Sequence, residues 1–204
     1  MVKINLMRIC ALALSVFFMG TSAEAQTKIW GVGSVGAVGV TDAEFSNAFT
    51  NATAFVAGDN PTTWTALTVN ESGGAVTPGN AYWVRNLTGY SNGAYWSGTT
   101  PVTSPSQANG VALFDSDFLD NAGTQGAFGT GTSPSAHRGE LISPRIDLTG
   151  YTDSALTIQF YTWYRDFQQT ELSISISVDD GQSWIATSDF RAAVPNLTQD
   201  FARI

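Results

Sequence analysis

The strictest pattern in this chain is an alternation of apolar and hydroxyl side chains over residues 172–178. Apolar residues occupy one set of positions and serines the other: Leu172, Ile174, Ile176 and Val178 against Ser173, Ser175 and Ser177. Successive side chains of a strand point to opposite faces, so a period of two indicates a strand with one buried and one exposed face. Such strands are typical of antiparallel sheets. The pattern therefore predicts an antiparallel β-fold around this segment.

Other strand candidates occur along most of the chain. A second alternation runs from Leu156 to about Tyr164, and weaker candidates cover residues 64–69, 81–86, 110–114 and 140–146. Only residues 41–55 have the spacing of a helix. Many short strands separated by turn residues predict an all-β protein, an antiparallel β-sandwich of the jelly-roll type. Residues 201–204 resemble the start of another strand, so we expect this fragment to lack the last strands of the sandwich.

The first 25 residues have the composition of a secretory signal peptide. Lys3 and Arg8 precede an apolar run, and small residues stand at the −3 and −1 positions of a cut after Ala25. The run is shorter than the ~20 residues that a transmembrane helix requires. We expect residues 1–25 to be removed and residues 26–204 to form a single domain. That domain would be secreted or held at the cell surface, with no transmembrane segment.

Composition excludes several classes of function. The formal net charge is −8, so the chain cannot neutralise a run of phosphates and nucleic acid is not an expected partner. The single cysteine, Cys10, lies in the leader. The mature domain therefore has no disulfide, no thiol nucleophile and no cysteine metal site.

Two motifs that often mark enzymes have simpler explanations here. Residues 31–36 match the glycine fingerprint of dinucleotide-binding folds, but too few residues precede them for the required strand, so a glycine-rich first strand is expected. His137 is the only histidine, and no G-x-S-x-G nucleophile motif accompanies it. We expect His137 to lie in a loop and to make an ordinary hydrogen bond.

Residues 177–184 fit the pattern S-x-D-x-G-x-x-W. This spacing predicts a hairpin turn in which the Asp179 carboxylate accepts backbone hydrogen bonds and Gly181 takes a positive φ. Trp184 would pack beneath the turn. Sialidase propellers repeat this motif, but one copy without a blade-length repeat indicates a stabilised hairpin and no more.

An acidic segment follows the strand candidate at 110–114. Asp115, Asp117 and Asp120 lie within six residues of one another. They would repel one another unless solvent or a cation separates them, and calcium takes oxygen ligands from irregular loops. The sequence therefore offers a calcium site at these three residues, with a solvated acidic turn as the alternative.

Two Tyr-Trp pairs form the second candidate site. Tyr82-Trp83 and Tyr95-Trp96 lie in a region rich in Asn, Ser and Gly. Ring faces beside amide and hydroxyl groups suit contact with sugars. Core packing explains the same residues equally well, and both interpretations stay open.

From Asn109 onward the order of motifs resembles the MAM-like jelly-roll modules of exported bacterial proteins, often called choice-of-anchor J domains. Gingipain-type cleaved-adhesin modules are similar. The resemblance rests on F-D-S-D at 114–117, L-x-S-P-x-I-D-L at 141–148, the strand near 156–164 and the turn at 177–184. It implies a non-catalytic jelly roll, often calcium-bound, carried beside adhesive, proteolytic or sorting segments. Asp115 and Asp117 match the acidic phrase of these families.

These observations favour a non-catalytic adhesion or interaction module, stabilised by calcium, that binds an extracellular protein or glycan. The alternative is a carbohydrate-binding module accessory to a secreted hydrolase, with Tyr82, Trp83, Tyr95 and Trp96 at its site. An enzyme that works with two carboxylates is a third interpretation, but no residue marks a general acid. Any sorting anchor would lie beyond Ile204.

Overall fold

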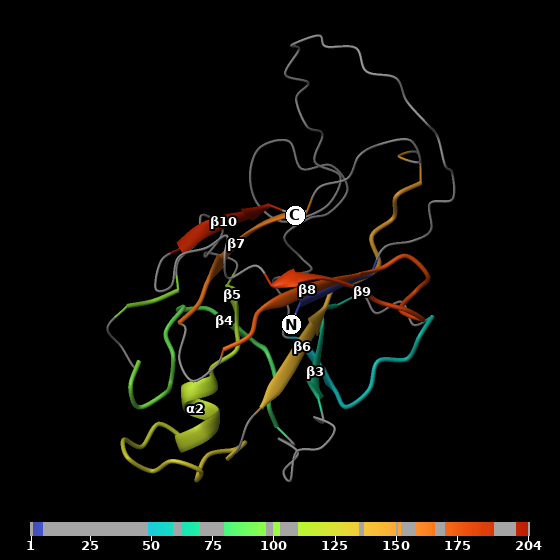
Figure 1. Cartoon of the computed structure of the whole chain (residues 1–204). Helices are drawn as coiled ribbons and strands as arrows, with labels where there is room; N and C mark the ends of the chain where they lie inside the picture. The colour runs from blue at the N-terminus through green and yellow to red at the C-terminus, as the bar shows by residue number, and fades with distance from the viewer. Residues whose placement is uncertain are drawn as a thin grey trace.

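The computed structural model describes residues 2–5, 49–58, 63–69, 80–96, 100–102, 110–134, 137–149, 151, 158–165, 170–189 and 199–203. The regular secondary structure of this part is almost all strand, with one short helix, as expected of an all-β protein (Figure 1). The strands are β1 (Val2–Asn5), β2 (Thr50–Ala52), β3 (Thr65–Val69), β4 (Val84–Asn86), β5 (Val111–Leu113), β6 (Arg138–Ile142), β7 (Gln159–Trp163), β8 (Ser173–Ser177), β9 (Ile185–Asp189) and β10 (Gln199–Arg203). The helix is α2 (Ser116–Asn121).

Six strands form the main sheet, in the order β2-β3-β6-β1-β8-β9. Two smaller sheets pair β10 with β7 and β4 with β5. Figure 1 shows the β7–β10 pair above β5 and β4, with α2 below them. A strand lies in or overlaps each of the six segments in which the sequence predicts one: 64–69, 81–86, 110–114, 140–146, 156–164 and 172–178.

The main sheet is mixed, and this corrects the expectation of a purely antiparallel one. β3–β6 and β8–β9 are antiparallel, whereas β2–β3, β1–β6 and β1–β8 are parallel. The reason is that β1 lies between β6 and β8, which both run in its own direction. The alternation at 172–178 predicts a strand but does not determine the direction of its neighbours.

The serine face of β8 is buried, which the sequence did not predict. Ile174 is 0% exposed, as expected, but Ser175 and Ser177 are also buried, at 2% and 0%. β8 is an inner strand of the sheet, paired with β1 on one side and β9 on the other. Small hydroxyl side chains tolerate such a position when they find hydrogen-bond partners.

Residues 50–52 form a strand, so the helix expected over residues 41–55 is wrong there. β2 runs parallel to β3, and the Thr50 N–H donates to the Trp64 carbonyl at 2.9 Å. Strand pairing with β3 outweighs the weak helical spacing of this segment. Residues 41–48 and the glycine-rich residues 31–36 lie outside the described part of the chain.

A buried cluster lies on one face of β3 and β6. Trp64, Ala66 and Leu141 form its centre. Ala66 and Leu141 are register partners across the two strands, so their side chains share a face of the sheet. Phe49, Tyr82, Trp83 and Ala112 are partly buried against this cluster. It therefore joins the main sheet to the segments that carry β4 and β5.

Candidate functional site

Asp115 caps the N-terminus of α2. Its carboxylate accepts a hydrogen bond from the Phe118 backbone N–H at 3.2 Å, which satisfies one of the unpaired donors of the first helical turn. It also accepts hydrogen bonds from the Ser91 hydroxyl and the Asn92 backbone N–H, both at 2.6 Å. The carboxylate thus fastens the loop at 91–96 to the start of α2.

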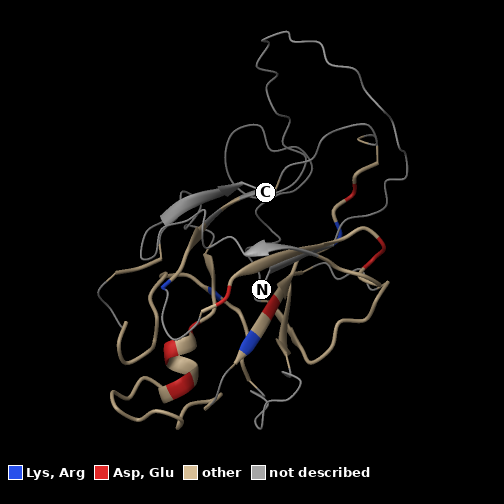
Figure 2. Ribbon diagram, viewed as in Figure 1, with Lys and Arg blue, Asp and Glu red and all other residues tan. Residues whose placement is uncertain are grey.

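Asp117 accepts hydrogen bonds from the same loop at 91–96, and Asp120 accepts one from a second segment. Asp117 Oδ2 accepts from the backbone N–H groups of Tyr95 at 2.8 Å and Trp96 at 3.0 Å. Asp120 Oδ1 accepts from the Gly129 N–H at 3.2 Å. Figure 2 shows these acidic positions on α2 in red. Each of the two carboxylates serves a different loop.

This donor pattern does not fit a shared calcium site. Calcium binds where several oxygens converge on one point, whereas here N–H and O–H donors point at the oxygens of Asp115 and Asp117. Within the described ranges, no group of three acidic, histidine or cysteine side chains has the arrangement of a metal site. Calcium binding at Asp115, Asp117 and Asp120 stays a prediction of the sequence, and the observed role of these carboxylates is to hold loops.

The two tryptophans of the aromatic pairs pack against other side chains. Trp83 lies against the buried cluster and donates from Nε1 to the Gly139 carbonyl at 3.1 Å. The Trp96 ring lies 5.0 Å from the Trp163 ring, centroid to centroid, and the Arg165 guanidinium carbon is 5.0 Å from the Trp96 centroid. Of the two interpretations that the sequence left open, sugar contact and core packing, Trp83 therefore fits core packing.

Tyr95 lies at the surface beside Phe128. The side chains are 42% and 63% exposed. Their ring centroids are 5.7 Å apart and their planes differ by 11°, which is a stacked pair. The Gly126 N–H donates to the Tyr95 hydroxyl at 2.9 Å and fixes the ring. Exposed stacked rings of this kind are common at contact surfaces.

Tyr82 lines an open pocket of about 250 Å³, here called the Tyr82 pocket. Apolar side chains and polar side chains, amides among them, line it together: Asn51, Asn80, Tyr82, Val84, Asn92, Leu113, Asp115, Phe118, Leu119 and Thr132. The structure thus brings together one predicted ligand-binding residue, Tyr82, and one predicted metal ligand, Asp115. Tyr95, Trp96, Trp83 and the other two carboxylates do not line this pocket.

No pattern in the sequence predicts the three asparagines of the Tyr82 pocket. Asn51, Asn80 and Asn92 are all exposed and come from three separate segments. Asn51 belongs to β2, in a stretch that the sequence assigned to a helix. Asn80 stands two residues before Tyr82, and this closeness is the one local signal for its place in the site.

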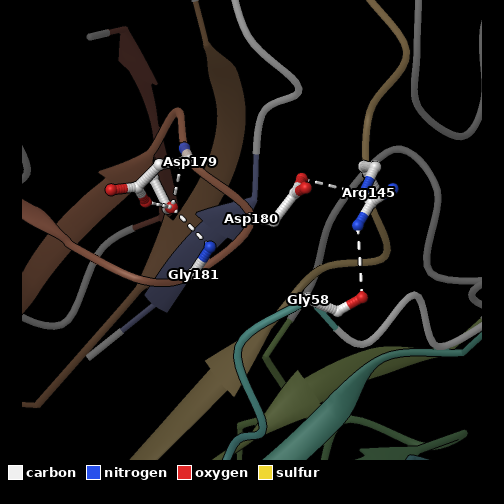
Figure 3. A network of polar contacts seen from close by, with 6 residues as sticks. Gly58, Arg145, Asp179, Asp180 and Gly181 are labelled. Carbon is white, nitrogen blue, oxygen red and sulfur yellow. Dashed lines mark hydrogen bonds and ion pairs between the residues drawn. The ribbon is translucent and has the colours of Figure 1, made fainter.

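The turn between β8 and β9 contains the predicted network centred on Asp179. The Ser183 N–H and the Ser177 hydroxyl each donate to Asp179 Oδ1 at 2.8 Å. The Gly181 N–H donates to the Ser177 oxygen at 2.7 Å, and the φ of Gly181 is +79° (Figure 3). Hydrogen bonds from Ser183, and then from Ser177, lower the pKa of Asp179 from its ordinary 3.8 to about 2. The prediction for Asp179 and Gly181 is confirmed.

Asp180 connects this turn to two distant segments. Its Oδ1 lies 3.1 Å from Arg145 Nε, and its backbone carbonyl accepts from the Gly58 N–H at 2.8 Å. Arg145 also donates to the Gly58 carbonyl at 3.4 Å, so the three residues form a closed set of contacts (Figure 3). The turn is therefore anchored to the segments after β2 and after β6.

His137 makes an ordinary contact with a side chain of α2. Its Nε2 lies 2.7 Å from the Ser116 hydroxyl oxygen, and its ring centroid is 5.8 Å from that of Phe114. This is the kind of loop hydrogen bond that the sequence predicts for it.

Among the described residues, no helix is long and apolar enough to cross a membrane.

Comparisons with known proteins leave the family of this chain open. No family model, no curated protein and no solved structure matches it. The resemblance to MAM-like modules therefore stays a prediction of the sequence, and any proposal of function depends on the geometry of the site itself.

Proposed function

We propose that this chain is a secreted or cell-surface adhesion module, without catalytic activity, that binds a glycan in the Tyr82 pocket. The observation that carries the proposal is the lining of this pocket. Three exposed asparagines stand beside an aromatic ring and apolar side chains, and they come from β2, the segment before β4 and the loop at 91–96.

This combination matches the chemistry of a sugar. An amide side chain both donates and accepts hydrogen bonds, as a sugar hydroxyl does. The apolar face of a pyranose ring packs on aromatic and aliphatic side chains, for which Tyr82, Leu113 and Phe118 are placed around the pocket. A glycan ligand is also compatible with both functions that the sequence favours, an adhesion module and a carbohydrate-binding module.

The role of Asp115 supports binding over catalysis. Its carboxylate lines the pocket, but it accepts three hydrogen bonds from Ser91, Asn92 and Phe118. A general acid must carry a proton to the substrate, and a general base must take one from it. A carboxylate held by three donors of its own chain is suited to fixing the loop instead.

Retention on polysaccharides tests the proposal. The full chain is passed over a panel of insoluble polysaccharides, with calcium and with a chelator, beside the variants Asn80→Ala and Gln182→Ala. Both replaced amides are exposed, but Gln182 lies in the β8–β9 turn and does not line the pocket. Melting curves establish that each protein is folded.

We expect at least one polysaccharide to retain the chain and the Gln182 variant, and the Asn80 variant to bind roughly tenfold more weakly, which corresponds to ~1.4 kcal/mol. The proposal is wrong if the folded chain binds no polysaccharide of the panel, or if Asn80→Ala leaves retention unchanged. Retention that disappears with the chelator would support the calcium predicted from the sequence.

A further inference from the structure

A second cavity, of about 380 Å³, lies on the other side of the main sheet from the buried cluster. Leu67 of β3 and Glu140 of β6 are register partners, and both line it. Their neighbours Ala66 and Leu141 belong to the buried cluster. Since side chains alternate along a strand, Leu67 and Glu140 face away from that cluster. We name this the Glu140 cavity.

The wall of the cavity contains a buried carboxylate. The Glu140 side chain is only 5% exposed and forms an ion pair with Arg138, with NH2 and Oε1 3.2 Å apart. Arg138 is 44% exposed and is not among the residues that line the cavity. Figure 2 shows the basic and acidic positions close together on β6. The carboxylate of this ion pair is therefore the acidic group in the lining of the cavity.

Two aromatic rings line the same cavity. Phe55 and Trp184 have centroids 5.9 Å apart and planes at 75°, so the rings meet edge to face. The β8–β9 turn holds them there, because Gly181 packs directly against the Phe55 ring and also lines the cavity. Thr53 also lines the cavity. Aromatic rings beside a carboxylate are the groups that bind ammonium cations.

We infer that the Glu140 cavity binds a compact organic cation, an ammonium group with small alkyl substituents. The carboxylate supplies the opposite charge, and Phe55 and Trp184 supply ring contacts to the alkyl groups and the positive centre. The net charge of −8 also attracts cations to the protein. This inference is independent of glycan binding, because the residues of the two cavities are different.

Choline and its uncharged carbon isostere, 3,3-dimethyl-1-butanol, test the inference on the full chain. Binding is measured by calorimetry and by the shift of the melting temperature. The variants are Glu140→Gln, Phe55→Leu and Glu171→Gln. Glu171 is exposed and does not line the cavity, so its replacement changes the net charge by the same amount as Glu140→Gln.

We expect saturable choline binding. The isostere should bind at least about tenfold more weakly, since the two ligands differ only in charge. Glu140→Gln should weaken choline binding about tenfold and Phe55→Leu about two- to fivefold, while Glu171→Gln leaves it unchanged. Equal binding of choline and the isostere, an equal effect of Glu171→Gln, or no saturable choline binding would overturn the inference. The comparison of the two ligands on the unmodified chain decides the question even if Glu140→Gln fails to fold.

Discussion

The residues of the β8–β9 turn act through short-range hydrogen bonds, which is why their pattern could be interpreted from the sequence. Asp179, Gly181 and the two serines lie within seven positions of one another, so no distant segment has to be known to place them. Asp180 is different. Its contacts with Arg145 and Gly58 link segments far apart in the chain, and no local pattern predicts them.

The lowered pKa of Asp179 leads to a prediction for the pH dependence of stability. The pKa falls from 3.8 to about 2 through the hydrogen bonds from Ser183 and Ser177. A carboxylate with a lowered pKa stabilises the fold above its ordinary pKa, and this stabilisation is lost as the pH falls through the lowered value. Asp179→Asn should therefore lower the melting temperature. The difference between the variant and the unmodified chain should be largest at pH 6, shrink from pH 4 to pH 2, and be small near pH 2. A difference that stays constant down to pH 2 would contradict the assignment.

Gly181 allows a second prediction at this scale, with Gly126 as a matched control. Both glycines have φ +79°, but a Cβ on Gly181 would overlap the Phe55 ring, whereas Gly126 has open space around it. Both alanine variants carry the strain of a positive φ, and Gly181→Ala carries the overlap in addition. We expect Gly181→Ala to be the less stable by about 1–3 kcal/mol in urea unfolding. Phe55→Ala in the same background should remove most of this difference, and equal effects of the two glycine variants would refute the contact.

At the scale of elements, the sequence predicted strands well and the helix α2 not at all. The alternations that contain β8 and β7 depend on neighbouring residues only, so they are visible locally. α2 is six residues long, too short for a helical period to show, and its carboxylates resembled a metal site. The structure uses Asp115 as a helix cap and Asp117 as an anchor for a loop 21 residues or more upstream in the chain.

Asp117 and Asp120 accept hydrogen bonds from different backbone amides, so their replacement should affect hydrogen exchange at different residues. Asp117→Ala should remove the hydrogen-exchange protection of the Tyr95 and Trp96 amides, because both N–H groups donate to its Oδ2. Asp120→Ala should affect the Gly129 amide and leave those two protected. Exchange followed residue by residue by NMR distinguishes the two patterns. If both variants expose all three amides together, the loops unfold as one unit and the assignment of separate anchors is wrong.

At the scale of the whole molecule, the sequence could not predict which segments meet. Asn51 of β2 and Asp115, the cap of α2, meet in the Tyr82 pocket. Phe55 follows β2 and Trp184 precedes β9, the two edge strands of the main sheet, and these rings meet in the Glu140 cavity. Such meetings depend on the strand order β2-β3-β6-β1-β8-β9, which long-range pairing determines. The most unexpected member of that order is β1, which lies inside the leader that the sequence predicts to be removed.

The place of β1 makes the removal of the leader a test of the whole sheet. β1 pairs with β6 and β8 at once, with Val2 opposite both Leu141 and Ile174, so its loss leaves two facing rows of unpaired backbone groups. After a cut behind Ala25 the chain begins at Gln26 and no longer contains β1. We therefore predict that removal of the leader weakens the main sheet.

The prediction is checked by melting curves of the chain from Gln26 and of the full chain. The chain from Gln26 should melt several degrees lower than the full chain, because β6 and β8 lose the strand that pairs with both of them. Equal melting temperatures of the two chains would contradict this prediction and would show that the pairing of β1 with β6 and β8 contributes little to the stability of the sheet.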